Sequence, residues 1–296
     1  MATLFFTKLK IRPQMLGILL ALLGAISLSI MGEFVKMVDP HISDGFILFA
    51  RFFLSFIFLL PFVLKDKNFS FKVVNMRGLL LRSVFGFVAM MCFFQTLRSM
   101  SAANAMLLIN TVPIFVPFVV YALTRVKTNL TVMFGIIISV LGVAIIIKPT
   151  SGVFDAAIII GLASGFFASL ATVLLRVVGK QNTPNQMMFY YFLYCAVMGL
   201  IAGVIYWQSL SVVDLVLLGF VGVFGVLYQF GLTYALKYTQ VRVVSPIMLS
   251  AIVFSGVLDW LFRGVIPGRT FIVGAFILII GILWVVFFSN RVEKQD

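Results

Sequence analysis

A few polar side chains stand inside otherwise apolar stretches of this sequence, and these are the residues that could do chemistry. Amides and hydroxyls there can hydrogen-bond a solute, and ionisable groups can bind a substrate or carry a proton. An Arg, Lys or Asp at the centre of a membrane helix costs about 2.5–3.5 kcal/mol on insertion scales, so each one predicts a site or a structural contact. The candidate substrate-binding residues are Asn110, Gln95, Gln229, Tyr228, Tyr234, Ser250 and Arg51, and the candidate proton carriers are Glu33 and Asp259.

Asn110 has the most suggestive setting, because Pro113 and Pro117 follow it. A proline leaves the carbonyl one turn back without its helical donor. In a membrane that carbonyl must face protein or a water-lined cavity. Asn110 therefore either binds substrate or hydrogen-bonds a neighbouring helix.

The same two alternatives apply to the other neutral groups. Gln95 and Gln229 lie in apolar stretches, and Ser250 follows Pro246, where a hydroxyl more often makes a packing contact. Tyr228 and Tyr234 could supply amphipathic walls of a binding cavity.

Arg51 lies about eight residues into the second apolar stretch, and Glu33 lies near the end of the first. Because the connection between the two stretches is short, these side chains either form a structural ion pair or belong to a substrate or proton site. If transport is coupled to protons, Glu33 is the first candidate carrier and Asp259 the second.

Other side chains have simpler interpretations. Arg82 and Arg176 are within reach of the membrane surface and are expected to extend to the headgroups. Tyr190, Tyr191 and Tyr194 are expected to form an interfacial aromatic belt. With one histidine and two cysteines in the chain, we predict no metal site, no cofactor and no histidine-based catalytic centre.

The elements that must position these residues are membrane helices. The chain is 62% hydrophobic and 10% charged, with a mean hydropathy of +1.18, whereas soluble domains carry roughly 25% charged residues. A helix needs about 20 apolar residues to cross the hydrocarbon. We predict ten crossings, near residues 14–37, 43–64, 77–98, 101–123, 130–147, 157–178, 186–207, 213–236, 242–262 and 270–289.

Charge sets the orientation. Of the 22 Lys and Arg, 16 fall on one side of the predicted membrane, five on the other, and Arg51 within a span. This bias explains the net charge of +13 without a nucleic-acid partner. It predicts a multi-pass protein of the cell's inner (cytoplasmic) membrane with both termini in the cytoplasm, which requires an even number of crossings.

The two halves of the chain repeat each other. Five crossings per copy, an odd number, means that the second copy enters the membrane upside down. We therefore predict an all-α membrane fold of two inverted five-helix repeats, residues 1–150 and 151–296, an arrangement typical of secondary transporters. The matches at a shift of 139 residues include Gly86 with Gly225, Arg98 with Lys237 and Gly142 with Gly281, and those at a shift of 144 include Lys36 with Lys180 and Pro40 with Pro184.

The ten-span layout, the stretch Phe49–Phe53 around Arg51, and Leu141–Ala144 with its copy Ile280–Leu283 resemble the EamA-type members of the drug/metabolite transporter superfamily. The stretch Phe52–Val63 also resembles bacterial S-adenosylmethionine uptake carriers of that superfamily. The resemblance implies a central cavity lined by the first, third, fourth, sixth, eighth and ninth helices. It also implies that the fifth and tenth helices pack together and support homodimers in some relatives. The loop from Thr124 to Thr128 lacks the acidic residue that many members carry there, so no role of that acid transfers.

These features together favour a secondary transporter working by alternating access. Its expected partners are the lipid bilayer, a small organic solute and a coupling proton; the solute is an amino acid, a nucleoside-like metabolite such as S-adenosylmethionine, or a drug-like compound. An integral membrane enzyme, a non-transporting scaffold subunit and a channel are the alternatives. Membrane enzymes usually show clustered His, Asp or Glu, and channels show rings of charge or a carbonyl filter. The sequence shows neither pattern, so we predict that the chain is not an enzyme.

Overall fold

The computed structural model describes residues 12–67, 69–99, 102–125, 129–147, 156–204, 210–264 and 268–292. Within these ranges the regular structure is entirely helical. The helices are α2 (Pro13–Met37), α3 (Asp44–Leu64), α4 (Met76–Ser99), α5 (Ala102–Ile109), α6 (Val112–Thr124), α7 (Leu130–Ile147), α8 (Ala156–Val178), α9 (Pro184–Val204), α10 (Val212–Tyr238), α11 (Val241–Met248), α12 (Ser250–Arg263) and α13 (Arg269–Val292).

The described helices account for the ten crossings. Eight segments are long and apolar enough to cross a membrane, and one of these joins α11 to α12. The two remaining crossings are α7 and the combination of α5 with α6, which also contain apolar helices. The large apolar side chains that stay exposed, such as Phe62, Phe118, Ile201 and Phe276, lie along these helices and face the lipid. The predicted all-α membrane fold is confirmed.

Two crossings are broken near their middles. The first break is at Asn110–Thr111, where Pro113 cannot donate to the carbonyl of Ile109. The second is at Leu249, three residues after Pro246. The backbone N–H groups of Thr111 and Leu249 both bond three residues back, to Leu108 (3.2 Å) and Pro246 (3.0 Å). Asn110 and Leu249 are equivalent under the shift of 139 residues, so both repeats break at the same place.

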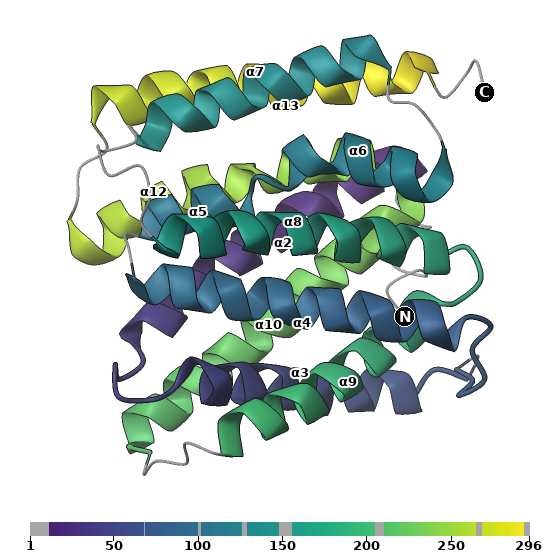
Figure 1. Ribbon diagram of the computed structural model, residues 1–296, viewed down its shortest axis with the longest axis vertical. Coiled ribbons are helices and arrows are strands. Elements are labelled where there is room, and N and C mark those ends of the chain that lie inside the picture. The colour runs from purple at the N-terminus through teal and green to yellow at the C-terminus, as the bar shows by residue number, and fades with distance from the viewer. Residues whose placement is uncertain are drawn as a thin grey trace.

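Equivalent helices of the two repeats make equivalent packing contacts. α2 packs on α10, and their repeat equivalents α8 and α4 pack on each other. α3 packs on its own equivalent α9, and α7 on its own equivalent α13. In Figure 1 the α7–α13 pair forms a layer along the top edge and α3 and α9 lie along the bottom, with the other pairs between them. The implied packing of the fifth helix on the tenth is therefore confirmed.

We use two names for the ends of this bundle. The basic end carries the segment 65–75, the turn from Gly179 to Thr183 and the turn between α10 and α11, and it lies to the right in Figure 1. The opposite end carries the turn between α2 and α3 and the start of α10.

The α7–α13 contact depends on glycine. A Cβ atom on Gly142 would lie 2.7 Å from the carbonyl oxygen of Gly274 and 2.8 Å from the Cα of Leu278. Its repeat equivalent, Gly281, meets α7 in the same way, with a Cβ 2.8 Å from the carbonyl oxygen of Gly135. Small residues of this kind let membrane helices approach closely.

We predict that Gly142→Ala lowers the stability of the purified protein by about 1–3 kcal/mol, the usual cost of overpacking. Thermal unfolding in detergent measures this. Gly219→Ala is the matched control, because a Cβ at Gly219 in α10 meets nothing within 4 Å, and it should leave the melting temperature equal or slightly higher. Equal melting temperatures for the two variants would contradict the proposed contact.

Candidate functional site

A small central cavity of about 40 Å³ lies where the two broken crossings meet. Ile109, Asn110 and Val112 line it from the first break, and Val244, Ser245 and Met248 line it from the second. The other walls come from three further helices, through Leu28 of α2, Ala168 and Thr172 of α8, and Tyr228 and Leu232 of α10. The family resemblance implied a cavity lined by six crossings, and five of them line this one.

Asn110 lies in this cavity as an almost fully buried side chain. Its amide nitrogen donates to the carbonyl of Met106 at 2.7 Å, one turn earlier in the same crossing. Since an amide has two N–H donors and an oxygen acceptor, this bond leaves polar capacity for a solute. Because this bond lies within one crossing, it is not the expected bond to a neighbouring helix, and substrate binding by Asn110 stays a prediction.

The other neutral candidates lie at three different levels. Tyr228 lines the cavity, whereas Gln229 turns away from it, fully buried, and donates to the hydroxyl of Thr233 at 2.9 Å. Tyr234 lies near the basic end and donates to Asn185 at 3.0 Å. Ser250 is buried beside the second break and donates to the carbonyl of Ile247 at 2.7 Å.

The remaining candidates lie elsewhere. Gln95 is exposed on α4. Glu33 is buried near the end of α2 and does not line the cavity. The side chain of Asp259 lies outside the described residues.

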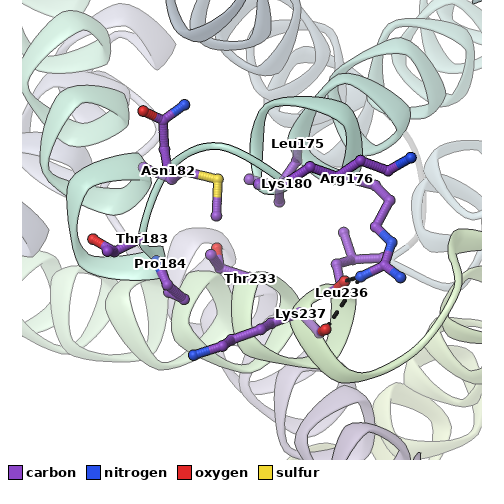
Figure 2. A pocket seen from close by; sticks show the side chains of 11 residues that line it. Leu175, Arg176, Lys180, Asn182, Thr183, Pro184, Thr233, Leu236 and Lys237 are labelled. Atoms are coloured by element: carbon purple, nitrogen blue, oxygen red, sulfur yellow. Dashed lines mark hydrogen bonds between the residues drawn. The ribbon is translucent and has the colours of Figure 1, made fainter. Parts of the chain in front are cut away.

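A larger pocket of about 370 Å³ opens at the basic end. It lies between the end of α8, the turn that follows, the start of α9 and the end of α10, as Figure 2 shows. The guanidinium of Arg176 reaches across it to the carbonyls of Leu236 and Lys237, and the Lys237 bond is 3.2 Å long. Arg176, Lys180 and Lys237 make the described lining cationic, with no carboxylate among its residues.

The pocket and the cavity lie one helical turn apart along the same two helices. On α8, Thr172 lines the cavity and Leu175 the pocket, and on α10 Leu232 lines the cavity and Leu236 the pocket. One turn of helix is about 5.4 Å long. The pocket at the basic end and the cavity at the helix breaks are therefore neighbours along these two helices.

Hydrogen bonds hold the described segments of the opposite end together. Arg98, at the end of α4, donates to the carboxylate of Asp44 at 3.0 Å and to the carbonyl of Asp39 at 2.9 Å, and it also bonds the carbonyl of Ile42. The backbone N–H of Asp39 donates to Asp214 of α10 at 3.2 Å. Hydrogen bonds from His41 lower the pKa of Asp39, which keeps this carboxylate ionised. These contacts join α2, α3, α4 and α10.

The expectation for Arg82 is wrong, and one of the two alternatives for Arg51, the ion pair with Glu33, is not found. Arg82 does not reach the headgroups, because it is 3% exposed and its guanidinium carbon lies 3.4 Å from the ring centroid of Tyr191. Arg51 makes no hydrogen-bonded pair with Glu33, since none of its three guanidinium nitrogens has a hydrogen-bond partner. The aromatic belt is also wrong for Tyr190 and Tyr191, which are buried.

Sequence reasoning missed several residues of the site. Thr172 and Ser245 line the central cavity. Ser245 directly precedes Pro246, which is a signal of the kind that identified Asn110. Thr172 has no such signal, because a threonine within an apolar helix usually bonds its own backbone, as Thr172 does to Ala168.

Comparison with known proteins agrees with this architecture. The model of the EamA-like transporter family matches residues 15–148 and again residues 155–287. The chain belongs to the EamA-like transporter family. Both matches cover five crossings each, so the repeat inferred from the sequence coincides with two copies of the family unit.

Named relatives of this EamA-like chain are transporters. The pseudopaline exporter CntI of Pseudomonas aeruginosa is 26% identical over 269 residues, covering 89% of this chain and 93% of the relative. The S-adenosylmethionine uptake transporter of Rickettsia bellii is 24% identical over 288 residues, covering 96% and 98%. Solute carrier family 35 member G1 of Homo sapiens is 26% identical over 274 residues, covering 85% and 73%.

A solved crystal structure shares the fold, with a TM-score of 0.71 at 14% identity over 96% of this chain and 100% of that one. The family and the apolar helices together make this chain a multi-pass membrane transporter of small solutes.

We predict that Asn110→Ala weakens solute binding about fivefold, the effect of losing one neutral hydrogen bond, while the protein still folds. Transport kinetics in proteoliposomes and thermal unfolding measure the two effects. Asn129→Ala is the control, because Asn129 is exposed at the start of α7. An unchanged apparent affinity in Asn110→Ala would remove this residue from the site.

Proposed function

We propose that the chain is a secondary transporter of the bacterial inner membrane that moves a small organic solute by alternating access. One observation supports this most strongly: equivalent regions of the two repeats are in opposite states. At the basic end the region around α8, α9 and α10 holds a pocket of about 370 Å³. Its equivalent at the opposite end, around α2, α3 and α4, is closed.

Equivalent residues define this contrast. Arg98 closes the opposite end by bonding the carbonyls of Asp39 and Ile42 in the turn after α2. The equivalent of Arg98 is Lys237, and the equivalent turn is 183–186. Lys237 lies at the edge of the pocket with its side chain exposed.

Exchange between these states is the transport cycle in this proposal. When the basic end closes, Lys237 takes the role that Arg98 has at the other end and bonds carbonyls of the turn 183–186. When the opposite end opens, Arg98 releases the turn between α2 and α3. The central cavity at the helix breaks, which both repeats line, then faces each side in turn.

Charge supports the orientation. The basic end carries most of the Lys and Arg of the chain, which places it and both termini in the cytoplasm. The pocket then opens to the cytoplasm.

The further partners follow from the same arrangement. In this proposal the solute is an amino acid, a nucleoside-like metabolite or a drug-like compound, consistent with the small solutes named for its relatives. Glu33 is the first candidate proton carrier, because it is buried close to the closed end, and Asp259 is the second. The α7–α13 pair lies along one edge of the bundle (Figure 1) and exposes Phe276, Leu283 and Phe287, which is the surface for a homodimer.

We predict saturable counterflow of one solute class in proteoliposomes, tested over amino acids, nucleosides, S-adenosylmethionine and organic acids with and without a proton gradient. Arg98→Gln removes charge-assisted hydrogen bonds that together contribute at least about 1.5–3 kcal/mol. The equilibrium constant between the two states should therefore change tenfold or more, and counterflow should become slower. Arg269→Gln, an exposed change at the same end, should have no effect. No counterflow for any class, accompanied by hydrolytic or transferase activity, would contradict the proposed function.

A further inference from the structure

Two arginine side chains lie inside the bundle with unused hydrogen-bond donors. Arg51 of α3 is 0% exposed and Arg82 of α4 is 3% exposed. All three guanidinium nitrogens of Arg51, and Nε and Nη1 of Arg82, have no hydrogen-bond partner. The great majority of buried polar groups in proteins have a partner, and a buried charge needs one most of all.

The contacts that the two cations do make are with aromatic rings. The guanidinium carbon of Arg51 lies 4.5 Å from the ring centroid of Phe52 and 6.0 Å from that of Tyr228, and Arg82 lies against Tyr191. The rings of Phe52 and Tyr191 pack against each other with centroids 5.5 Å apart, so the two arginines and their rings form one cluster. The face of an aromatic ring attracts a cation. It does not form the directional N–H···O hydrogen bonds that an oxygen acceptor would form with the guanidinium.

No carboxylate joins this cluster from the described parts of α3, α4, α9 or α10. Asp44 bonds Arg98 and Asp214 bonds Ser211, both at the opposite end, and Asp66 bonds Asn185 at the basic end. The hydroxyl of Ser55 and the thiol of Cys195 donate to backbone carbonyls of Gly222 and Ser83. Glu33 of α2 accepts no bond from Arg51 either. Among the described residues, no carboxylate therefore forms an ion pair with Arg51 or Arg82.

Two other arginines of the chain do have hydrogen-bond partners. Arg98 bonds two carbonyls and a carboxylate, and Arg176 bonds two carbonyls. Only the two arginines near the centre of the described bundle combine full burial with several unused donors.

Glycines at equivalent positions of the two repeats make room for the cluster. A Cβ atom on Gly225 of α10 would lie 3.3 Å from Nε of Arg51, and one on Gly86 of α4 would lie 2.9 Å from the ring of Tyr191. These two glycines are equivalent under the shift of 139 residues. The repeated glycine therefore lets Arg51 pack closely on α10 and Tyr191 pack closely on α4.

Tyr228 separates the cluster from the central cavity. It lines that cavity, and its ring is also one of the two that Arg51 faces. A rotation of this one side chain would open the cavity to Arg51. The neighbouring pocket of the basic end has a described lining that carries Arg176, Lys180 and Lys237 and no carboxylate, so it attracts anions.

We propose that Arg51 and Arg82 form a subsite for the carboxylate or phosphate group of an organic anion, which is the solute that this chain transports. The inference rests on the proposed transport function. The guanidinium fork matches the planar or tetrahedral oxyanion with paired hydrogen bonds. In the empty state the rings of Tyr191 and Tyr228 hold the two cations, and the bound oxyanion takes over the donors that the rings leave unused.

Binding to the wild-type protein is the first test, because it does not depend on any variant folding. Thermal unfolding in detergent is compared for pairs in which the second member lacks the acidic groups of the first: citrate with trimethyl citrate, glycerol 3-phosphate with glycerol, and S-adenosylmethionine with its decarboxylated form. We expect stabilisation by the acid of at least one pair and none by its partner. The first and third pairs identify a carboxylate, and the second identifies a phosphate.

Variants then locate the effect. Arg51→Gln and Arg82→Gln should each weaken binding of the stabilising acid about 10- to 100-fold, as expected for losing a charged hydrogen bond. Each should leave the melting temperature of the empty protein equal or higher, since an unpaired buried charge is removed. Arg51→Lys keeps the charge and should retain part of the preference for the acid. Arg77→Gln, an exposed change on α4, is the matched control.

Three results would overturn the subsite. The acid and neutral members of every pair could stabilise the protein equally, or chloride alone could give the full effect. The glutamine variants could also lower the melting temperature and weaken the binding of acidic and neutral solutes equally, as a purely structural role of the arginines predicts. Failure of the transport proposal is distinguishable, because counterflow would then be absent even for an acid that binds.

Discussion

The hydrocarbon of the bilayer offers no water to unpaired polar groups, and this constraint organises the whole molecule. It explains why the described chain is helical throughout its crossings, since a helix satisfies its own backbone. It also explains why the exceptions gather in one place. The two helix breaks, at Asn110–Thr111 and at Leu249, meet at the central cavity, which the polar side chains of Asn110 and Ser245 line.

The same constraint connects the fold to transport. Two copies of one five-helix unit pack so that α2–α10 and α8–α4 are equivalent pairs, yet the ends they form differ. Arg98 fastens one end, while its equivalent Lys237 borders an open pocket at the other. A symmetric state would require both ends to be open or both closed. The asymmetry is thus the feature that makes an inverted repeat useful to a transporter, because the copies can exchange conformations.

Sequence alone predicted the crossings and the repeat because both depend on local signals, namely the lengths of apolar runs and matched glycines, prolines and basic residues. Asn110 was placed at a break for the same reason, through Pro113. What the sequence did not reveal depends on which face of a helix meets which neighbour. Gln95 faces outward, whereas Arg82, near the start of α4, is covered by Tyr191, a residue more than a hundred positions away. Leu249 carries no polar signal, so the second break emerged only in the folded chain.

The central claim, that equivalent regions of the repeats exchange open and closed states, is tested most directly by distances between spin labels in double electron–electron resonance. With Cys92 and Cys195 replaced by serine, one pair of labels goes on Gln181 and Tyr238 across the pocket. The other goes on their equivalents Met37 and Ser99 across the closed end. The account predicts a short, narrow distribution for Met37–Ser99 without solute and a longer one when transported solute is added, while Gln181–Tyr238 shortens. Distances that stay constant, or that lengthen together at both ends, would contradict it.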